Sequence, residues 1–372
     1  MVYFDNAATS FPKPVAVLSE LRRCVTEYCG NPGRSSHAMS LLAAEHIYRA
    51  REAIAGHFHA QAPEGVVFTY NATYALNLAI KSFVTEKCHL LVSDLEHNAV
   101  MRPIYRLCRE IGVEYGVFST EGDLKENIER EIRPDTRGII STLASNVIGR
   151  SVSLPVLSEV ARRHGLFLIV DASQAAGHRA IDISAAPCDA LCAPGHKALF
   201  GIQGSGFVIF RDLKRRGGLV EGGSGSDSTN PDMPELLPEG YEAGTLATPA
   251  IATLARGVEL IDEIGIEVIG ARLDRLTQAL AEAVSAVRGA GLLAASEGIV
   301  TFNYREVPSW VIASELDRRG ICTRAGLHCA PSAHRIIGTA DVGAVRASPS
   351  YLNRDGEIDK FYRALSEIAA IY

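Results

Sequence analysis

Short apolar runs alternate with amphipathic stretches between residues 66 and 210. The runs have the length of strands, and the stretches at 73–83 and 100–111 repeat their apolar positions at helical spacing. We expect strands at 66–70, 89–93, 113–118, 138–143, 166–170, about 190–193 and 206–210. Strands that alternate with helices are typical of a largely parallel sheet with helices on both faces. The pattern therefore predicts an α/β fold.

The pattern changes after this region. Glycine and serine dominate residues 215–230, and prolines follow, which is typical of a mobile loop. Beyond the loop come two long helical patterns, an apolar run and a further helical pattern, at 249–263, 267–287, 299–304 and 309–319. This order predicts a smaller α+β domain at the C-terminus. We expect an N-terminal segment that packs with the small domain, a large domain and the small domain, at 1–14, 15–250 and 251–372.

Composition and charge narrow the class of protein. The 372 residues contain 47% hydrophobic and 22% charged side chains, which suits folded domains and disfavours disordered chains. The net charge of −6 and the lack of a Lys/Arg cluster give no electrostatic footprint for nucleic acid. No apolar run reaches the roughly 18 residues of a membrane span, and the N-terminus lacks a secretory pattern. We expect a cytoplasmic protein that acts on small molecules.

Eight cysteines are scattered along the chain, and none forms a CxxC pair. This distribution argues against a disulfide scaffold or a zinc knuckle. We expect most of these thiols to be reduced and buried, and one to be reactive.

An aspartate and a lysine follow two of the expected strands. Asp171 comes directly after the run at 166–170, and Lys197 follows the run at about 190–193. Ligands of such sheets bind beyond the carboxyl ends of the strands, so both side chains are placed for a site. A structural ion pair remains the alternative for either residue. Because a partly desolvated lysine suits Schiff-base chemistry, Lys197 indicates pyridoxal 5′-phosphate (PLP) if the other parts of a PLP site are present.

Each further part of a PLP site has a candidate. Asp171 can keep the pyridine nitrogen protonated, and His97 follows the expected strand at 89–93 and can stack on the ring. Thr73 is a plausible N-cap of the helix at 73–83, where backbone amides face a phosphate. Taken singly, an N-cap needs no ligand, and a histidine after a strand usually makes a local hydrogen bond. Only the set points to a cofactor.

Short motifs run in order along nearly the whole chain. They lie at Tyr3–Ser10, Asn31–Arg34, Glu96–Asn98, Ala144–Gly149, Asp171–Gln174, Gly195–Lys197, Tyr241–Thr245, Arg324–Pro331 and Val345–Ser348. In this order and spacing the chain resembles the PLP-dependent cysteine desulfurases and selenocysteine lyases, within the class V aminotransferase group. The resemblance implies the PLP-dependent transferase fold type I, in which a large domain with a mostly parallel sheet is followed by a smaller α+β domain.

The resemblance also implies roles for individual residues. Lys197 would bind PLP covalently, Asp171 would contact the pyridinium and His97 would stack on the ring and handle protons. Gln174 would donate a hydrogen bond to the phenolic oxygen of PLP. The other cofactor-binding residues that it implies are Ala72, Thr73, Asn146, His196, Gly244 and Thr245. Of these, Thr73 and His196 would hold the phosphate. The pair at 244–245 would reach the phosphate of a neighbouring subunit, which implies a homodimer.

Cys329 is the residue that distinguishes one reaction from the others of this large group. It follows Arg324 and His328 in a glycine-containing loop, where we expect positive charge to favour the thiolate. The resemblance makes Cys329 the nucleophile that takes sulfur from L-cysteine, leaving L-alanine and a persulfide. It assigns the substrate carboxylate to Asn146 and Arg346, with Arg324 as a further substrate-binding residue. An inert buried thiol is the alternative.

Other functions stay open at this point. The nearest is a selenocysteine lyase that releases selenium from L-selenocysteine. Another class V aminotransferase or lyase is less favoured, because neither needs Cys329 in this setting. A non-catalytic metal-binding protein would use His328, Cys329 and His334, at irregular spacing. A sulfur- or selenium-acceptor protein is a possible partner.

Overall fold

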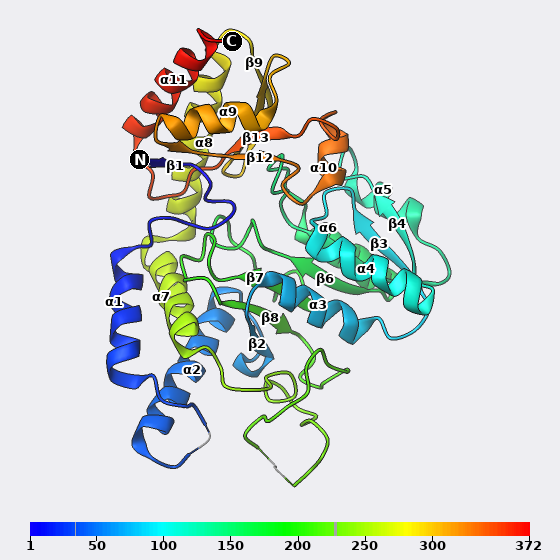
Figure 1. The fold of residues 1–372 in the computed structure, drawn as a ribbon. Helices are drawn as coiled ribbons and strands as arrows, with labels where there is room; N and C mark the ends of the chain where they lie inside the picture. The colour runs from blue at the N-terminus through cyan, green and yellow to red at the C-terminus, as the bar shows by residue number, and fades with distance from the viewer. Residues whose placement is uncertain (34, 227–228) are drawn as a thin grey trace.

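A seven-stranded sheet forms the centre of the protein (Figure 1). The structure is a computed structural model that describes residues 1–33, 35–226 and 229–372. Along the sheet the strands are β2 (Val66–Thr69), β8 (Gly206–Phe210), β7 (Ala190–Pro194), β6 (Phe167–Asp171), β5 (Thr136–Thr142), β3 (His89–Ser93) and β4 (Glu114–Phe118). β8 is antiparallel to both of its neighbours, and the other pairs are parallel. The predicted α/β fold with a largely parallel sheet is confirmed.

Helices bury both faces of this sheet, so its strands are apolar at consecutive positions. In β6, Leu168 and Val170 pack into one core and Ile169 packs into the other. One core is covered by α1 (Val15–Arg23), α2 (Ala38–His57), α5 (Leu124–Glu131), α6 (Leu154–His164) and α7 (Thr248–Ile264). The opposite core is covered by α3 (Ala72–Phe83) and α4 (Asn98–Ile111). Alternate side chains of one strand thus serve two cores.

The C-terminal part has a core of its own around a four-stranded sheet. Its strands are, in order, β12 (Arg324–Gly326), β13 (Ala344–Ala347), β10 (Ile299–Tyr304) and β9 (Ala290–Ser296). The helices around it are α8 (Ile266–Ser285), α9 (Ser309–Arg318) and α11 (Asp355–Ala369), whereas the short helix α10 (Pro331–Ile336) packs Ala333 into the core of the large sheet. The start of the chain joins this part, because β1 (Val2–Tyr3) pairs with β11 (Ile321–Cys322) and Phe4 is fully buried there (Figure 1).

α7 belongs to the core of the large sheet. Its residues Leu254 and Val258 are fully buried there, and the helix packs against α1 and α2. The C-terminal core begins with α8, so the chain passes from one core to the other near Gly265, between the two helices.

The remaining short helices are η1 (Cys24–Tyr28), a π-helix, and η2 (Pro63–Gly65), a 3₁₀ helix. Arg34, in the motif at 31–34, and Asp227 and Ser228, in the loop at 215–230, lie outside the described residues. Among the described residues, no helix is both long and apolar enough to cross a lipid bilayer.

All eight cysteines are free thiols, but the expectation that most are buried is wrong. Four are buried, two are half-buried, and Cys29 and Cys329 are exposed. Helix ends and loops place these thiols at the surface, which spacing along the sequence does not reveal.

A close approach between α7 and the turn after Lys197 gives a first prediction. A Cβ added at Gly257 would lie 1.9 Å from the carbonyl oxygen of Leu199. A Cβ added at Gly56 in α2 would have no other atom within 4 Å. Gly257→Ala should therefore lower the free energy of unfolding by about 1–3 kcal/mol, because the helix must move. Gly56→Ala, the matched control, should gain up to about 1 kcal/mol. Urea denaturation of both variants tests this, and equal stability of Gly257→Ala and wild type would contradict it.

Candidate active site

The carboxyl ends of β5, β6 and β7 open into a cavity of about 300 Å³. This is at the lower end of the roughly 300–1,000 Å³ usual for small-molecule sites. The predicted site residues that line the cavity are Ala72, Thr73, His97, Asn146, Asp171, Gln174, His196, Lys197, Arg324 and Arg346. Three predicted residues do not line it: Gly244, Thr245 and Cys329. The fold thus brings predicted residues from six of the sequence motifs, together with Ala72 and Thr73, to one place.

Lys197 and Asp171 face this cavity from adjacent strands. Asp171 ends β6 and is 3% exposed, and its Oδ1 accepts a hydrogen bond from the backbone N–H of Ser173 at 2.9 Å. Lys197 lies in the turn after β7. Burial and the charges of Arg346 and Arg324 lower the pKa of Lys197 to about 8, although Asp171 opposes the shift. A sizeable fraction of Lys197 is therefore a neutral amine slightly above neutral pH.

His97 is the N-cap of α4 and is neutral near pH 7. Its Nδ1 accepts a hydrogen bond from the backbone N–H of Ala99 at 3.0 Å. Burial and the charge of Lys197 lower its pKa to about 4. Because Nδ1 is an acceptor, the single proton of the neutral ring is on Nε2. The local hydrogen bond expected for an ordinary histidine is present, and it fixes the tautomer of a ring that also lines the cavity.

The start of α3 corrects one prediction. The N-cap is Asn71 rather than Thr73: the side chain of Asn71 accepts from the backbone N–H of Tyr74 at 3.1 Å, and the helix begins at Ala72. Asn71 lies two residues nearer the strand, directly before the first helical residue Ala72, and its side-chain oxygen can reach the N–H three residues on, as a preferred N-cap residue does. Within the described residues, the N–H groups of Ala72 and Thr73 have no acceptor, so they are free to bind an anion.

His196 adds a second free group. Its Nδ1 is buried and has no partner among the described residues. Burial, together with the charges of Lys197 and Lys13, lowers its pKa to about 4, so the ring is neutral. The backbone carbonyl of His196 is held by the side chain of Lys13 at 2.9 Å and by the N–H of Ser10 at 3.0 Å. The N-terminal segment therefore fixes the turn that carries Lys197.

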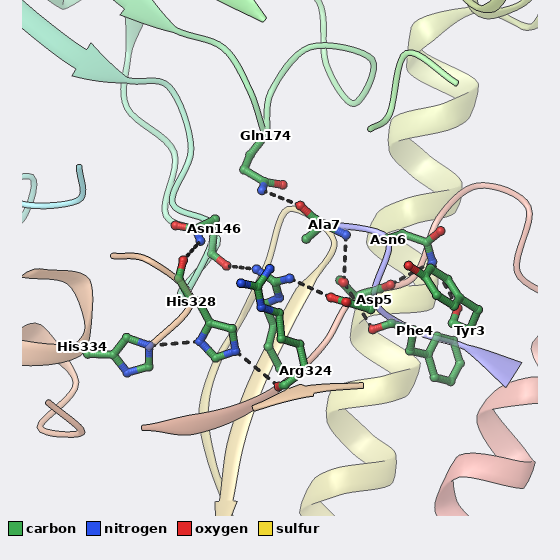
Figure 2. A network of polar contacts seen from close by, with 12 residues as sticks. Tyr3, Phe4, Asp5, Asn6, Ala7, Asn146, Gln174, Arg324, His328 and His334 are labelled. Atoms are coloured by element: carbon green, nitrogen blue, oxygen red, sulfur yellow. Dashed lines mark hydrogen bonds and ion pairs between the residues drawn. The ribbon is translucent and has the colours of Figure 1, made fainter. Parts of the chain in front are cut away.

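A network of polar contacts joins the N-terminal segment to both sheets (Figure 2). The side-chain N–H of Gln174 donates to the carbonyl of Ala7 at 3.0 Å. Asp5 forms an ion pair with Arg346 at 2.8 Å, and a second N–H group of this arginine donates to the carbonyl of Asn146 at 2.9 Å. Arg346 is 1% exposed, and its Nε has no partner among the described residues. One donor of a buried guanidinium is thus left for a ligand.

Two arginines lie directly opposite each other on neighbouring strands. Arg324 on β12 pairs in register with Arg346 on β13, and both line the cavity. Like charges at such positions are destabilising. Asp5 compensates one of the two charges, so the cavity keeps an excess of positive charge at this corner. An excess of this kind favours an anionic ligand such as a carboxylate.

Cys329 lies just outside the cavity, in an exposed position with a positive φ of 57°. Its carbonyl accepts a hydrogen bond from the backbone N–H of Asn98 at 2.8 Å, which ties it to the start of α4. Cys329 lines a groove together with Thr73 and His97, and both of these also line the cavity. The thiol is therefore at the mouth of the site.

His328 does not supply the positive charge expected beside Cys329. It is 3% exposed, and burial and the charge of Arg346 lower its pKa to about 3. Its Nδ1 is 3.0 Å from Nε2 of His334, whose Nδ1 is in turn 2.7 Å from the hydroxyl of Thr339. This expectation is wrong because the ring is desolvated beside a guanidinium. The chain of contacts is structural: it supports the backbone before Cys329.

Other expectations concern metal binding and Gly244. Within the part of the chain that the structure describes, no three metal-ligating side chains form a cluster, and His334 and His328 contact each other.

Gly244 and Thr245 line a separate hollow that also includes residues of α2. A neighbouring subunit would have to bring this pair to a cavity like the one described.

Sequence reasoning missed two acidic residues of the site. Asp5 is the ion-pair partner of Arg346, and Glu96, which is 1% exposed, lies in the chain between two residues that line the cavity, Leu95 and His97. Both are within motifs that the sequence offers, at 3–10 and 96–98, but neither position is marked by a strand end. Their partners are distant in sequence: Arg346 for Asp5, and Thr142 for Glu96.

A comparison with known proteins fits this geometry. A family model described as aminotransferase class-V matches residues 2–361. A probable cysteine desulfurase of Methanothermobacter thermautotrophicus is 32% identical, over 100% of this chain and 95% of that protein. The chain belongs to the aminotransferase class-V family. A second relative of this class-V aminotransferase, a probable cysteine desulfurase of Halalkalibacterium halodurans, is 29% identical over 99% of this chain and 93% of that protein.

Solved structures share the fold of this chain. The apo structure of a cysteine desulfurase from Thermococcus onnurineus matches with a TM-score of 0.91 and 25% identity, covering 100% of this chain and 95% of that one. A cysteine desulfurase from Escherichia coli matches with a TM-score of 0.89 and 23% identity, covering 99% and 94%. The fold predicted from the resemblance is thereby confirmed.

The buried carboxyl group of Glu96 predicts how the free energy of unfolding depends on pH. Its Oε1 accepts from the backbone N–H of Thr142 at 2.8 Å, and its Oε2 is buried without a partner among the described residues. Burial raises the pKa of Glu96 from 4.5 to about 8. The unfolded chain therefore loses this proton first, and the free energy of unfolding should fall as the pH rises from 4.5 towards 8.

Glu96→Gln removes this titration and keeps the shape of the protonated acid. We expect the variant to be more stable than wild type at about pH 8 and little changed at about pH 5. Urea denaturation at both pH values measures the difference, with the exposed Glu121→Gln as the matched control. A pH dependence in Glu96→Gln equal to that of wild type would show that another group titrates.

Proposed function

We propose that this member of the aminotransferase class-V family is a PLP-dependent cysteine desulfurase, which converts L-cysteine to L-alanine and leaves the sulfur as a persulfide on Cys329. The observation that carries the proposal is the combination of a lysine with a lowered pKa, a corner of paired arginines and a thiol at the mouth of one cavity. The relatives that bear the name cysteine desulfurase support it.

The residues of the cavity fit PLP. The free N–H groups of Ala72 and Thr73 and the unpartnered Nδ1 of His196 suit its phosphate. Asp171 suits its pyridinium nitrogen, and Lys197 would hold it covalently. When bound, PLP withdraws electrons from the substrate and so makes the bonds at its Cα easier to break.

Arg324 and Arg346, which together form the arginine corner of the cavity, would orient the substrate. The unpartnered Nε of Arg346 and the nearby guanidinium of Arg324 would receive the carboxylate of L-cysteine. Asn146 is held in place on both sides: its carbonyl accepts from Arg346, and its side-chain N–H donates to the carbonyl of His328 at 2.7 Å. Binding at this corner would therefore position the substrate and the backbone before Cys329 together.

Two neutral groups move protons in the cavity. The amine of Lys197 can accept the proton from Cα of the substrate, because its pKa of about 8 leaves part of it unprotonated. His97 has its proton on Nε2, from which it can donate to the substrate. These groups would work near or slightly above neutral pH.

Cys329 takes the sulfur. Its thiolate attacks the sulfur of the substrate, a bond between the two sulfurs forms, and the bond between Cβ and sulfur breaks. The electron pair of that bond stays on carbon, which takes up a proton to become the methyl group of L-alanine. The exposed position of Cys329 supports later transfer of the sulfur to an acceptor.

The selenocysteine lyase alternative is not favoured, since the relatives above bear the name cysteine desulfurase. Another aminotransferase or lyase of the family would give no role to a thiol at the mouth of the cavity. A metal-binding function has no cluster of ligands within the described residues.

The assembly and the location of the protein belong to the same proposal. A homodimer is supported by exposed apolar side chains on α2, among them Met39, Leu41 and Tyr48, of which Tyr48 lines the hollow at Gly244 and Thr245. We place the protein in the cytoplasm and expect an acceptor protein as a further partner. The separate cores support a division into an N-terminal segment, a large domain and a small domain, with α7 in the large domain.

Single-turnover chemistry tests the proposal. Without an acceptor, the PLP-loaded enzyme should form one L-alanine for each chain, and mass spectrometry should find the added sulfur on Cys329. Cys329→Ala should bind PLP as wild type does but lose at least about a hundredfold in L-alanine formation, because no thiolate attacks the sulfur. Undiminished activity of this variant, or persulfide on another cysteine, would reject Cys329 as the nucleophile.

Lys197→Ala is the companion variant. It should lose the covalent link to PLP, so that borohydride reduction no longer fixes the cofactor to the chain. In the wild-type protein, the same treatment should label Lys197. A label on a different lysine would overturn the site assignment.

Asp5→Asn tests the arginine corner. The variant removes the charge that compensates Arg346, so the free energy of unfolding should fall by about 3–5 kcal/mol. A carboxylate ligand should restore part of this loss, because it replaces the missing charge. We expect L-alanine to raise the melting temperature of Asp5→Asn more than that of wild type, as measured by thermal unfolding. Equal shifts would mean that the carboxylate binds elsewhere.

A further inference from the structure

A basic groove lies beside Cys329, outside the cavity. Its volume is about 310 Å³, and its walls come from α3, α4 and the loop of Cys329. The residues that line it are Thr73, Asn77, Lys81, His97, Asn98, Ala99, Arg102, Pro103, Arg106 and Cys329. Three of these side chains are cations, and none of them is a carboxylate.

Two of the three cations, Lys81 and Arg102, are free to bind a ligand. Arg106 pairs with Glu110 at 2.7 Å, one helical turn away on the exposed side of α4. Within the described residues, Lys81 and Arg102 have no ion-pair or hydrogen-bond partner. Arg102 is exposed, and its charge acts on His97 at the mouth of the cavity. The groove is therefore positive along the approach to the thiol.

The positive charge of this groove is opposite in sign to the net charge of the chain. The chain has a net charge of −6, so its average field repels anions. Chemistry inside the cavity does not need these cations, because Arg324 and Arg346 already supply the carboxylate corner. A cationic groove at the exit side of Cys329 therefore suits a different anionic ligand.

We propose that this groove binds a second kind of sulfur acceptor beside the acceptor protein, namely a small thiol carrying at least two carboxylates. The volume of the groove suits a small molecule, and Lys81, Arg102 and Arg106 can contact two carboxylates at once. Ala99 and Pro103 leave an apolar floor for its carbon chain. This inference rests on the proposed function, since it requires a persulfide on Cys329.

The transfer step balances without an added oxidant or reductant. The acceptor thiolate attacks the terminal sulfur of the persulfide, and a new sulfur–sulfur bond forms on the acceptor. The bond between that sulfur and Sγ of Cys329 breaks, and its electron pair leaves on Sγ as a thiolate. The acceptor becomes a persulfide, and the enzyme returns to its starting state.

The experiment separates this step from the formation of the persulfide. The PLP-loaded enzyme reacts with L-cysteine alone, excess substrate is removed, and L-alanine and the persulfide on Cys329 are quantified. Mercaptosuccinate, with two carboxylates, or neutral 2-mercaptoethanol is then added, and loss of the persulfide is followed. Failure to form the persulfide refutes the proposed function, whereas the second step tests the groove alone.

Variants that lack cations of the groove test whether the groove binds the acceptor. In Lys81→Gln/Arg102→Gln the discharge rate with mercaptosuccinate should fall about tenfold, and with 2-mercaptoethanol it should change less than about twofold. Arg109→Gln, on α4 but outside the groove, is the matched control and should leave both rates unchanged. Arg102→Lys should keep most of the wild-type rate. Raising the salt from about 0.05 to about 0.5 M should slow only the reaction with mercaptosuccinate.

Two results would overturn the proposal. One is an equal loss with both thiols in the double variant, which would mean that the substitutions disturb the Cys329 loop rather than an anion site. The other is discharge by mercaptosuccinate that is insensitive to the variants and to salt. Persulfide formation is measured in each variant beforehand, so a folding defect is recognised before the transfer is compared.

Discussion

The arrangement of the active-site cavity depends on the contacts of one almost completely buried guanidinium, that of Arg346. A buried charge is tolerated only with close partners, and here these come from distant parts of the chain: Asp5 near the N-terminus and the carbonyl of Asn146 after β5. Satisfying one arginine therefore brings the N-terminal segment, the large sheet and the C-terminal sheet to the same point (Figure 2). The donor left over, together with Arg324 opposite, is what gives the cavity its preference for an anion.

Burial sets the protonation states around this point, and it acts in opposite directions on acids and bases. It lowers the pKa of His97 to about 4 and that of Lys197 to about 8, and it raises the pKa of Glu96 to about 8. All three groups can thus be neutral near pH 8, while Asp5, Arg324 and Arg346 supply the charges. A site with neutral proton carriers beside a fixed anion-binding corner suits proton transfer at a bound amino acid.

The cavity and the basic groove share Thr73, His97 and Ala99, so under the proposed function a substrate would bind and its sulfur would leave on two sides of the same residues. Cys329 is placed between them by backbone contacts: Asn98 holds its carbonyl, and Asn146 holds the carbonyl of His328. The positive φ at both Cys329 and His328 exposes the thiol at the mouth. The placement of the thiol therefore depends on the contact between the two sheets' loops, not on its own segment.

The sequence by itself determined the sheet, its buried helices and the strand-end residues Asp171 and Lys197, because alternation of apolar runs and position after a strand are local properties. Motif order along the chain likewise indicated Cys329 and Arg346. Only the tertiary structure decided that Asn71 rather than Thr73 caps α3, that His328 is neutral, that Asp5 pairs with Arg346, and that three cations line one groove. These depend on desolvation and on contacts between residues up to 341 positions apart, which no local pattern encodes.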